Sequence, residues 1–209
     1  NFKITTKPLK DKIKSNIKIL CVAKFGYPRK NIIMLLKSII ILKKKINISL
    51  TLIGDYPKKD KGLSKDFSNL YYLDQINKFI KKNNLDNSVS IFFDIPHSKM
   101  YKFYNESSLF VLPATNEPAS ISIVEALSMG LPVICSDNCG TKSYIDHGVN
   151  GYIFKDNSLL SLTKYLNLII SKSNYFQFLD NAHSYFEKNL TEEIFIQKFN
   201  NLIDDYKWK

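Results

Sequence analysis

The feature that most constrains the fold of this chain is a regular alternation of short apolar runs with amphipathic segments. The run IKILCVAK (17–24) is rich in strand-forming residues, and NIIMLLKSIIILKKK (31–45) follows with apolar residues at helical spacing. The same order of predicted strand and predicted helix recurs at 48–55 and 70–85, 88–95 and 99–108, and 109–114 and 122–130. Further strands are predicted at 132–137 and 151–154, and helices from 158 to 209.

This order of elements predicts one α/β domain. Strands that are apolar along their whole length are typical of a parallel sheet with helices on both faces. We therefore expect a Rossmann-like doubly wound sheet of about six parallel strands over residues 17–209, ending in helices. Residues 1–16 are polar and rich in Lys, and we expect a linker or arm there. Tail aromatics at helical spacing are expected to pack in the core: Tyr175, Phe176, Phe178, Tyr185, Phe186, Phe195 and Phe199.

The net charge of +11 does not by itself identify a nucleic-acid-binding protein. Nearly all of the 30 basic residues are Lys, and they accompany many Asn and Ile residues, as is typical of an AT-rich genome. A hydrophobic content of 44% over 209 residues supplies a core and excludes a disordered tail. We expect no nucleic acid among the partners.

The cysteines favour a reducing, cytoplasmic location. Cys21, Cys135 and Cys139 form an odd set, and two of them lie in predicted buried strands. Because no second close pair completes a zinc site, we expect no metal. The longest apolar stretch, 32–42, is shorter than the ~20 residues that cross a bilayer.

In doubly wound folds, ligands bind at the carboxyl ends of the strands. The loops to consider are 24–31, 54–57, 94–97 and 114–122. The sequence has no G-x-G-x-x-G after the first strand and no G-x-x-x-x-G-K-[ST], so neither a dinucleotide fingerprint nor a P-loop is present. Other groups would have to hold a phosphate ligand.

The stretch 109–137 carries the most chemical information. Glu117 follows a predicted strand, and Glu125 lies about one turn inside the next helix. Between them, Ser120, Ile121 and Ser122 present N–H groups at the helix start, with a serine available as cap, and this end suits a diphosphate. Glu125 is then placed to accept hydrogen bonds from a ribose, and Glu117 to face a sugar. The competing interpretation is a carboxylate that complements the helix dipole and a solvated loop acid.

Cations follow the first predicted strand. Lys24, Arg29 and Lys30 belong to loop 24–31, at the same expected edge of the sheet. Fixed cations can neutralise the charge of a departing diphosphate without a metal ion. The competing interpretation is that they are ordinary surface residues, since Lys is abundant throughout.

These residues resemble the retaining glycosyltransferases of family 4, whose GT-B architecture has two Rossmann-like domains. Glu117 and Glu125 have the spacing of that family's E-x7-E motif. Residues 21–24 and 28–31 resemble its G-R and P-x-K-G elements, and 52–55 resembles its V-G-x-G-P turn. The motif is followed, as in the family, by Ala126, Gly130, Pro132, Val133 and Gly148 to Tyr152. The similarity extends over nearly the whole chain from about residue 17.

The resemblance implies a role for each matching residue. The family's diphosphate-binding cations fall on Lys24 and Lys30, the sugar-contacting Glu on Glu117 and the ribose-binding Glu on Glu125. Such enzymes need no metal or other cofactor, and they retain the anomeric configuration because the leaving group departs on the face that the acceptor attacks. The remaining donor-binding positions implied are the amides of Ser120, Ile121 and Ser122, the turn at Gly54, and the backbone of Asp94 and Ile95 near the base.

The sequence departs from the family pattern in several places. Lys24 stands where Arg is usual, and one extra residue precedes Lys30, so Arg29 is a second candidate for the phosphate-binding cation. Lys lacks the bidentate geometry of Arg. Ala119 replaces a bulky aromatic residue, and Lys142-Ser143 replaces a Pro-Glu pair on the sugar side.

A complete enzyme of this kind has an N-terminal domain that binds the acceptor, and this chain begins where the interdomain linker would lie. We expect the donor-binding half of a hexosyltransferase, from a truncated or a split enzyme. Its expected partners are a nucleotide-diphosphate sugar, with UDP as the nucleotide, and a glycan or lipid-linked acceptor in bacterial surface polysaccharide assembly.

Two alternatives stay open. One is a noncatalytic module that binds nucleotides, nucleic acid or a membrane surface. Nucleic-acid affinity that falls steeply with salt, while nucleotides fail to compete, would favour it. The other is a sugar-nucleotide epimerase of the same two-domain architecture.

Short Lys runs, Lys43 to Lys45 and Lys58, Lys59 and Lys61, would suit peripheral contact with an anionic bilayer where a lipid-linked acceptor resides.

Overall fold

The computed structural model describes residues 16–56, 67–171 and 175–205. Within them, one sheet of six parallel strands has the order β3-β2-β1-β4-β5-β6. The order reverses between β1 and β4, which makes this position the switch point of a doubly wound sheet. The predicted fold class is confirmed. The strands are β1 (Ile17–Val22), β2 (Ile48–Gly54), β3 (Val89–Phe93), β4 (Leu109–Leu112), β5 (Val133–Ser136) and β6 (Gly151–Phe154).

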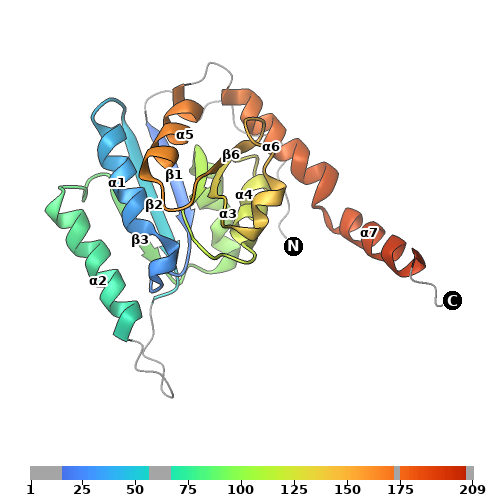
Figure 1. The fold of residues 1–209 in the computed structure, drawn as a ribbon, viewed down its shortest axis with the longest axis horizontal. Coiled ribbons are helices and arrows are strands. Elements are labelled where there is room, and N and C mark those ends of the chain that lie inside the picture. Colours follow the sequence, from blue (N-terminus) through green and yellow to red (C-terminus); the bar gives the residue numbers. More distant parts are fainter. Residues whose placement is uncertain (1–15, 57–66, 172–174, 206–209) are drawn as a thin grey trace.

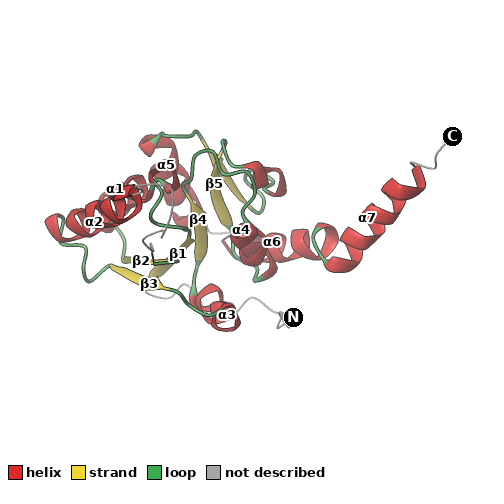
Figure 2. Ribbon diagram, turned by 90° about the horizontal axis from the view of Figure 1, so that it is seen from below, coloured by secondary structure: helices red, strands yellow, loops and turns green. Residues whose placement is uncertain are grey.

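Helices cover both faces of the sheet (Figures 1 and 2). The α-helices are α1 (Ile32–Lys43), α2 (Phe67–Lys82), α3 (His97–Glu106), α4 (Ile121–Ser128), α5 (Leu159–Ser171), α6 (Tyr175–Asn189) and α7 (Glu192–Asp205). On one face α1 packs against α2 and α5, and on the other α4 packs against α6. Two short 3-10 helices, η1 (Pro28–Lys30) and η2 (Gly140–Tyr144), are additions that the sequence pattern did not predict.

The most apolar runs occupy the middle of the sheet. Every residue of β4 and of β5 is buried. Side chains on both faces of these strands meet a layer of helices, which is why the runs are apolar throughout and do not alternate. The loops that follow them therefore leave the sheet from a rigid, fully covered centre.

The C-terminal helix departs from the expected packing. The aromatic residues of α6 at Tyr175, Phe178 and Phe186 are buried as predicted, but Phe176 of α6 is 41% exposed, and Phe195 and Phe199 of α7 are 68% and 52% exposed. The expectation that these three side chains pack in the core was wrong. Helix α7 contacts α6 and extends away from the sheet (Figure 1), so within the described residues no second layer covers its apolar side.

The expected linker at 1–16 lies almost wholly outside the described residues. Within the described part of the chain, no helix is both long enough and apolar enough to span a bilayer.

Candidate functional site

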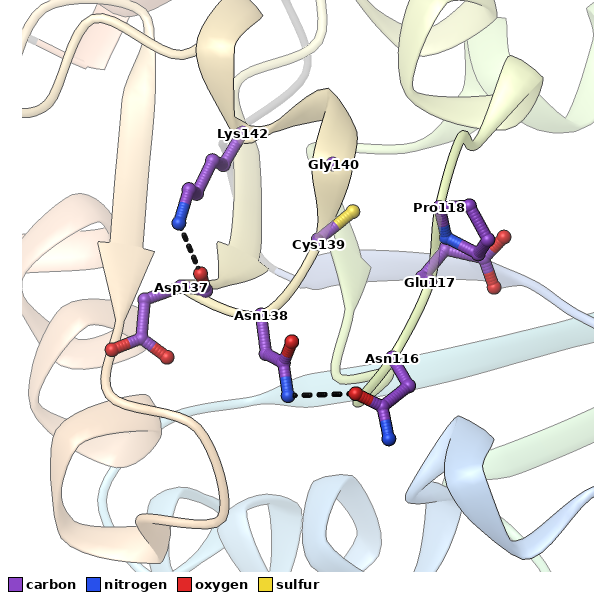
Figure 3. Close-up of a pocket in the computed structure, with 8 residues that line it drawn as sticks. All are labelled: Asn116, Glu117, Pro118, Asp137, Asn138, Cys139, Gly140 and Lys142. Carbon is purple, nitrogen blue, oxygen red and sulfur yellow. Dashed lines mark hydrogen bonds between the residues drawn. The ribbon is translucent and has the colours of Figure 1, made fainter.

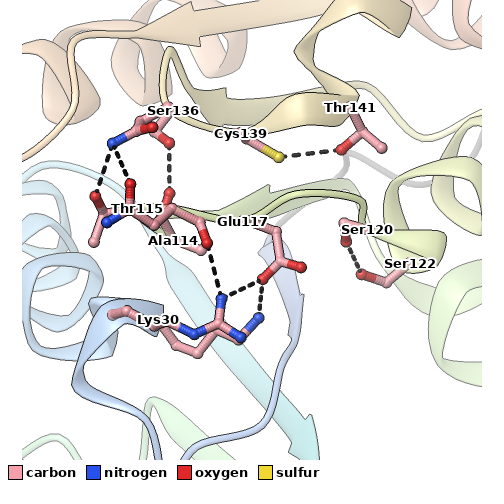
Figure 4. A network of polar contacts seen from close by, with 12 residues as sticks. Lys30, Ala114, Thr115, Glu117, Ser120, Ser122, Ser136, Cys139 and Thr141 are labelled. Carbon is pink, nitrogen blue, oxygen red and sulfur yellow. Dashed lines mark hydrogen bonds and ion pairs between the residues drawn. The ribbon is translucent and has the colours of Figure 1, made fainter.

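Glu117 lies where two cations meet. One oxygen of its carboxylate pairs with the ammonium of Lys30, and Nη1 of Arg29 lies 3.1 Å from the same oxygen (Figure 4). Lys30 and Glu117 are both buried, whereas the Arg29 side chain is 40% exposed. The 3-10 helix η1 positions both cations after β1, and the backbone N–H of Thr115 donates to the Arg29 carbonyl at 2.8 Å. The structure therefore brings together both candidates for the phosphate-binding cation.

The loop that carries Glu117 is held by the loop after β5. The backbone N–H of Glu117 donates to the carbonyl of Asn138 at 3.3 Å, and the N–H of Gly140 donates to the carbonyl of Glu117 at 2.7 Å. A β-carbon at position 140 would lie 1.9 Å from the carbonyl oxygen of Pro118, so only glycine permits this close approach. A cavity of about 400 Å³ opens beside the two loops, and Glu117 and Lys142 both line it (Figure 3).

A third loop braces the same region. The amide of Asn138 donates to Asn116 Oδ1 at 3.1 Å and to Asp156 Oδ2 at 3.2 Å (Figure 3 shows the first bond). The hydroxyl of Thr115 also donates to Asp156, at 2.7 Å. Asp156 follows β6, and sequence reasoning missed it because no motif marks a residue that only ties neighbouring loops together.

Helix α4 has eight residues and begins shortly after Glu117. Ser120 is the N-cap residue by position, but its side chain does not cap the helix. Its hydroxyl instead lies 2.8 Å from that of Ser122, so the expectation of a serine cap was wrong (Figure 4). The first N–H groups of a helix commonly lack an intrahelical acceptor, but here the N–H of Ile123 already donates to the carbonyl of Ser120 at 3.2 Å.

Glu125 lines a second cavity, of about 390 Å³. Its lining includes most of the residues predicted on the nucleotide side, namely Gly54, Ile95, Ile121, Ser122 and Glu125, together with Val22, Ile53, Asp55, His97 and Met100. The carboxyl ends of β1 and β2, the loops after β2 and β3, and residues of α3 and α4 thus contribute to one concave surface. This is the carboxyl edge of the sheet, where ligands of this fold class bind.

The turn after β2 depends on Gly54. A β-carbon at this position would lie 2.0 Å from the carbonyl oxygen of Ala23. Asp94 has a φ of 51° in the left-handed region, and its N–H donates to the Gly54 carbonyl at 3.0 Å. Its Oδ1 accepts the N–H of Tyr56 at 3.2 Å, so the Asp94 side chain connects two loops.

Lys24 pairs with a different carboxylate from the other two cations. Its ammonium lies 3.9 Å from Asp55, and both side chains are 67% exposed. An exposed pair of this kind contributes little to stability, so the Lys24 ammonium can exchange partners readily.

Two side chains that sequence reasoning did not assign to the site contact Glu125. His97 Nε2 lies 2.9 Å from Oε1, and the hydroxyl of buried Tyr104 donates to Oε2 at 2.6 Å. Burial and the neighbouring carboxylate raise the pKa of Tyr104 above its usual range. The spacing of positions 97, 100 and 104, at intervals of three and four residues, was the available sequence signal, because it places the three side chains on one face of α3.

The thiols near Glu117 differ sharply in acidity. Hydrogen bonding from Cys135 is the main cause that lowers the pKa of Cys139 to about 6, and the Thr141 hydroxyl, 3.1 Å from its sulfur, adds to this. The pKa of Cys135 is raised, because it shares a hydrogen bond with Cys139 and is buried. Among the described residues, no group of three His, Cys, Asp or Glu side chains could hold a metal ion.

The chain belongs to the family of glycosyl transferases group 1, whose model matches residues 4–189. The fold agrees with this assignment, because the solved structures that it resembles are GT-B glycosyltransferases.

The match to each relative covers only part of that relative's length. An uncharacterized glycosyltransferase of Haemophilus influenzae is 28% identical over 138 residues, which are 64% of this chain and 36% of the relative. The amylovoran biosynthesis glycosyltransferase AmsK of Erwinia amylovora is 24% identical over 98 residues, which are 44% of this chain and 24% of AmsK. Anabaena HepE, solved in complex with UDP and glucose, superposes with a TM-score of 0.76 at 19% identity, over 91% of this chain and 48% of HepE. The chain thus spans less than half the length of each.

Proposed function

We propose that this chain is the donor-binding domain of a glycosyltransferase that moves a hexosyl group from a UDP-linked sugar to an acceptor with retention of configuration. One observation carries the proposal. Glu117 and Glu125 lie on either side of the α4 N-terminus, the first between two cations and the second on a cavity of about 390 Å³. A negatively charged diphosphate at that helix start would be attracted by the positive end of the helix dipole and by the nearby cations. The family and the UDP bound to HepE support this proposal.

Each part of the donor has its own surroundings in this proposal. The ribose hydroxyls donate to Glu125, and the base lies against Gly54, Asp94 and Ile95. The sugar occupies the cavity of about 400 Å³ beside Glu117. The diphosphate lies between these regions, bound by the amides of Ser120, Ile121 and Ser122 and by the cations Lys24, Arg29 and Lys30.

Transfer breaks the bond between the anomeric carbon and a diphosphate oxygen, and the bonding pair leaves with the diphosphate. The acceptor hydroxyl forms the new bond on the same face, and its proton passes to the departing oxygen. Arg29, Lys30 and Lys24 are positioned to neutralise the charge that develops, which is why we propose that no metal ion takes part.

The remaining elements of the proposal concern the acceptor. We place its binding site on an N-terminal domain outside this chain, and the acceptor is a glycan or a lipid-linked glycan in bacterial surface polysaccharide assembly. One relative is named as a biosynthetic glycosyltransferase for amylovoran, which supports a polymer product. The proposed location is the cytoplasm, at the inner face of the membrane.

Calorimetric titration of the chain with UDP and with GDP tests the nucleotide site. We expect UDP to bind, and Glu125→Ala to weaken it about 10- to 100-fold, since hydrogen bonds to a charged partner are lost. Glu187→Gln is the matched control, because Glu187 also pairs with a histidine on a helix surface, at 4.0 Å from His183. Absence of binding by either nucleotide, or unchanged binding in Glu125→Ala, contradicts the proposal.

A further inference from the structure

Tyr104 contacts Glu125 from within the protein core. Its side chain is fully buried between α3 and the sheet, and it does not belong to the cavity lining. Its hydroxyl nevertheless donates to Glu125 Oε2 at 2.6 Å, within the range of charge-assisted O–H···O⁻ bonds. Tyr104 can therefore affect a ligand only through Glu125.

The contact determines how Glu125 presents its carboxylate. A glutamate on a helix has three rotatable side-chain bonds, and an exposed one samples many orientations. Here one oxygen is bound to a phenol that packing holds in place. Because the pKa of Tyr104 is raised, the phenol keeps its proton and donates throughout the physiological range. The other oxygen, Oε1, lies 2.9 Å from Nε2 of His97, and His97 and Glu125 both line the cavity of about 390 Å³.

We propose that Tyr104 is a positioning residue of the donor site, which holds the Glu125 carboxylate in the orientation that accepts hydrogen bonds from the nucleotide ribose. This inference rests on the proposed function. It adds a residue that contributes to recognition of the ribose by positioning Glu125. When Tyr104 is changed, the carboxylate loses the bond that a buried group makes to Oε2, while His97, whose side chain is 69% exposed, still contacts Oε1.

Ribose discrimination is the quantity that separates this role from a structural one. We define it as the ratio of the dissociation constants of 2′,3′-dideoxy-UDP and UDP, both measured by calorimetry on the chain. Removing the hydroxyl in Tyr104→Phe is expected to lower this ratio about 10-fold, as Glu125→Gln does. In the Glu125→Gln background, Tyr104→Phe should change the ratio no further, because the two residues act as a unit.

Tyr175→Phe is the matched control. Tyr175 is also buried, and its hydroxyl donates to the backbone carbonyl of Ser108, away from both cavities. This variant should keep the wild-type ratio while showing a loss of thermal stability similar to that of Tyr104→Phe. If Tyr104→Phe does not fold, Glu125→Asp is the second test. It keeps the charge but shortens the side chain, so it should also lose ribose discrimination.

The outcomes are distinguishable. A wild-type ratio in folded Tyr104→Phe, or in Glu125→Asp, overturns the positioning role while UDP binding that depends on Glu125 keeps the proposed function. Failure of the unmodified chain to bind UDP overturns the proposed function itself. A drop in the ratio for Tyr104→Phe and for Tyr175→Phe alike shows a general structural effect and overturns the inference.

Discussion

The carboxylate of Glu117 forms a buried ion pair with the ammonium of Lys30, and it also receives the guanidinium of Arg29 at 3.1 Å. One carboxylate thus contacts two of the three cations that we assign to the diphosphate. Because Glu117 and a diphosphate are both anionic, they compete for the same two partners. The first two predictions follow from this competition.

Removing the Glu117 charge should strengthen nucleotide binding. In Glu117→Gln the two cations keep a hydrogen-bond acceptor but lose a competing anion, and we expect UDP to bind about 3- to 10-fold more tightly by calorimetry. In a sugar-transfer assay the same change should lower turnover, because Glu117 faces the sugar in our proposal. Glu106→Gln, which removes an exposed carboxylate 4.0 Å from Lys102, is the control. Weaker UDP binding in Glu117→Gln would contradict the competition.

Lys30 and Arg29 should contribute unequally to the stability of the protein, but both should contribute to UDP binding. The Lys30 side chain is 8% exposed, so Lys30→Gln breaks a buried pair and should lower the free energy of unfolding by about 3 kcal/mol. The half-exposed Arg29 should contribute below about 1 kcal/mol in the same urea experiment. Both variants should weaken UDP binding. Equal losses of stability, or a loss of affinity in only one variant, would be inconsistent with the shared site.

The order of elements could be predicted because it depends on local patterns. The runs that became β4 and β5 are apolar throughout since both of their faces are covered, and this pattern is visible without coordinates. Phe195 and Phe199 show the limit of such reasoning. Their helical spacing correctly predicts a helix with an apolar face, but it does not show whether another layer of the domain covers that face, and both side chains are exposed.

The candidate site was predicted in part for the same reason. Glu117, Glu125 and the cations follow strands, and the topology alone brings the carboxyl ends of parallel strands to one edge. The spacing of positions 97, 100 and 104 places them on one face of α3, but no spacing rule connects position 104 with position 125 on another helix, so the contact of Tyr104 with Glu125 could not be predicted. The pairing of both cations with Glu117 was missed because ion pairing depends on the path of η1, a 3-10 turn with no clear sequence signal.

Gly140 should be needed for the position of Glu117. In Gly140→Ala the new β-carbon meets the Pro118 carbonyl. We expect this overpacking to lower the free energy of unfolding by about 1–3 kcal/mol, as measured by thermal unfolding. The affinity for UDP-glucose should fall more than that for UDP, because the displaced loop carries Glu117. Gly148→Ala is the comparison, since its φ of 84° strains alanine at about 1 kcal/mol while its nearest neighbour is 3.9 Å away. An unchanged ratio of the two affinities would show that the loop tolerates the extra carbon.

Cys139 should make the free energy of unfolding depend on pH between about 6 and about 9, a range that begins well below the ordinary pKa of a cysteine. Its pKa is lowered to about 6 in the folded protein and returns to the ordinary value of 9.0 on unfolding. Between these two values the unfolded chain binds more protons than the folded one, so the free energy of unfolding rises as the pH increases from about 6 to about 9. The stabilisation is fully present above that window and is lost as the pH falls through the folded-state value.

Two matched variants isolate this effect from the other titrating groups. Urea unfolding at several pH values should show that Cys139→Ala loses the rise, while Cys21→Ala keeps it. Cys21 is a suitable control because it is equally buried, and burial raises its pKa to about 12, so it stays protonated throughout the window. If the two alanine variants depend on pH in the same way as the unmodified chain, Cys139 is not a thiolate in the folded protein, and the hydrogen bonds from Cys135 and Thr141 do not stabilise a negative charge there.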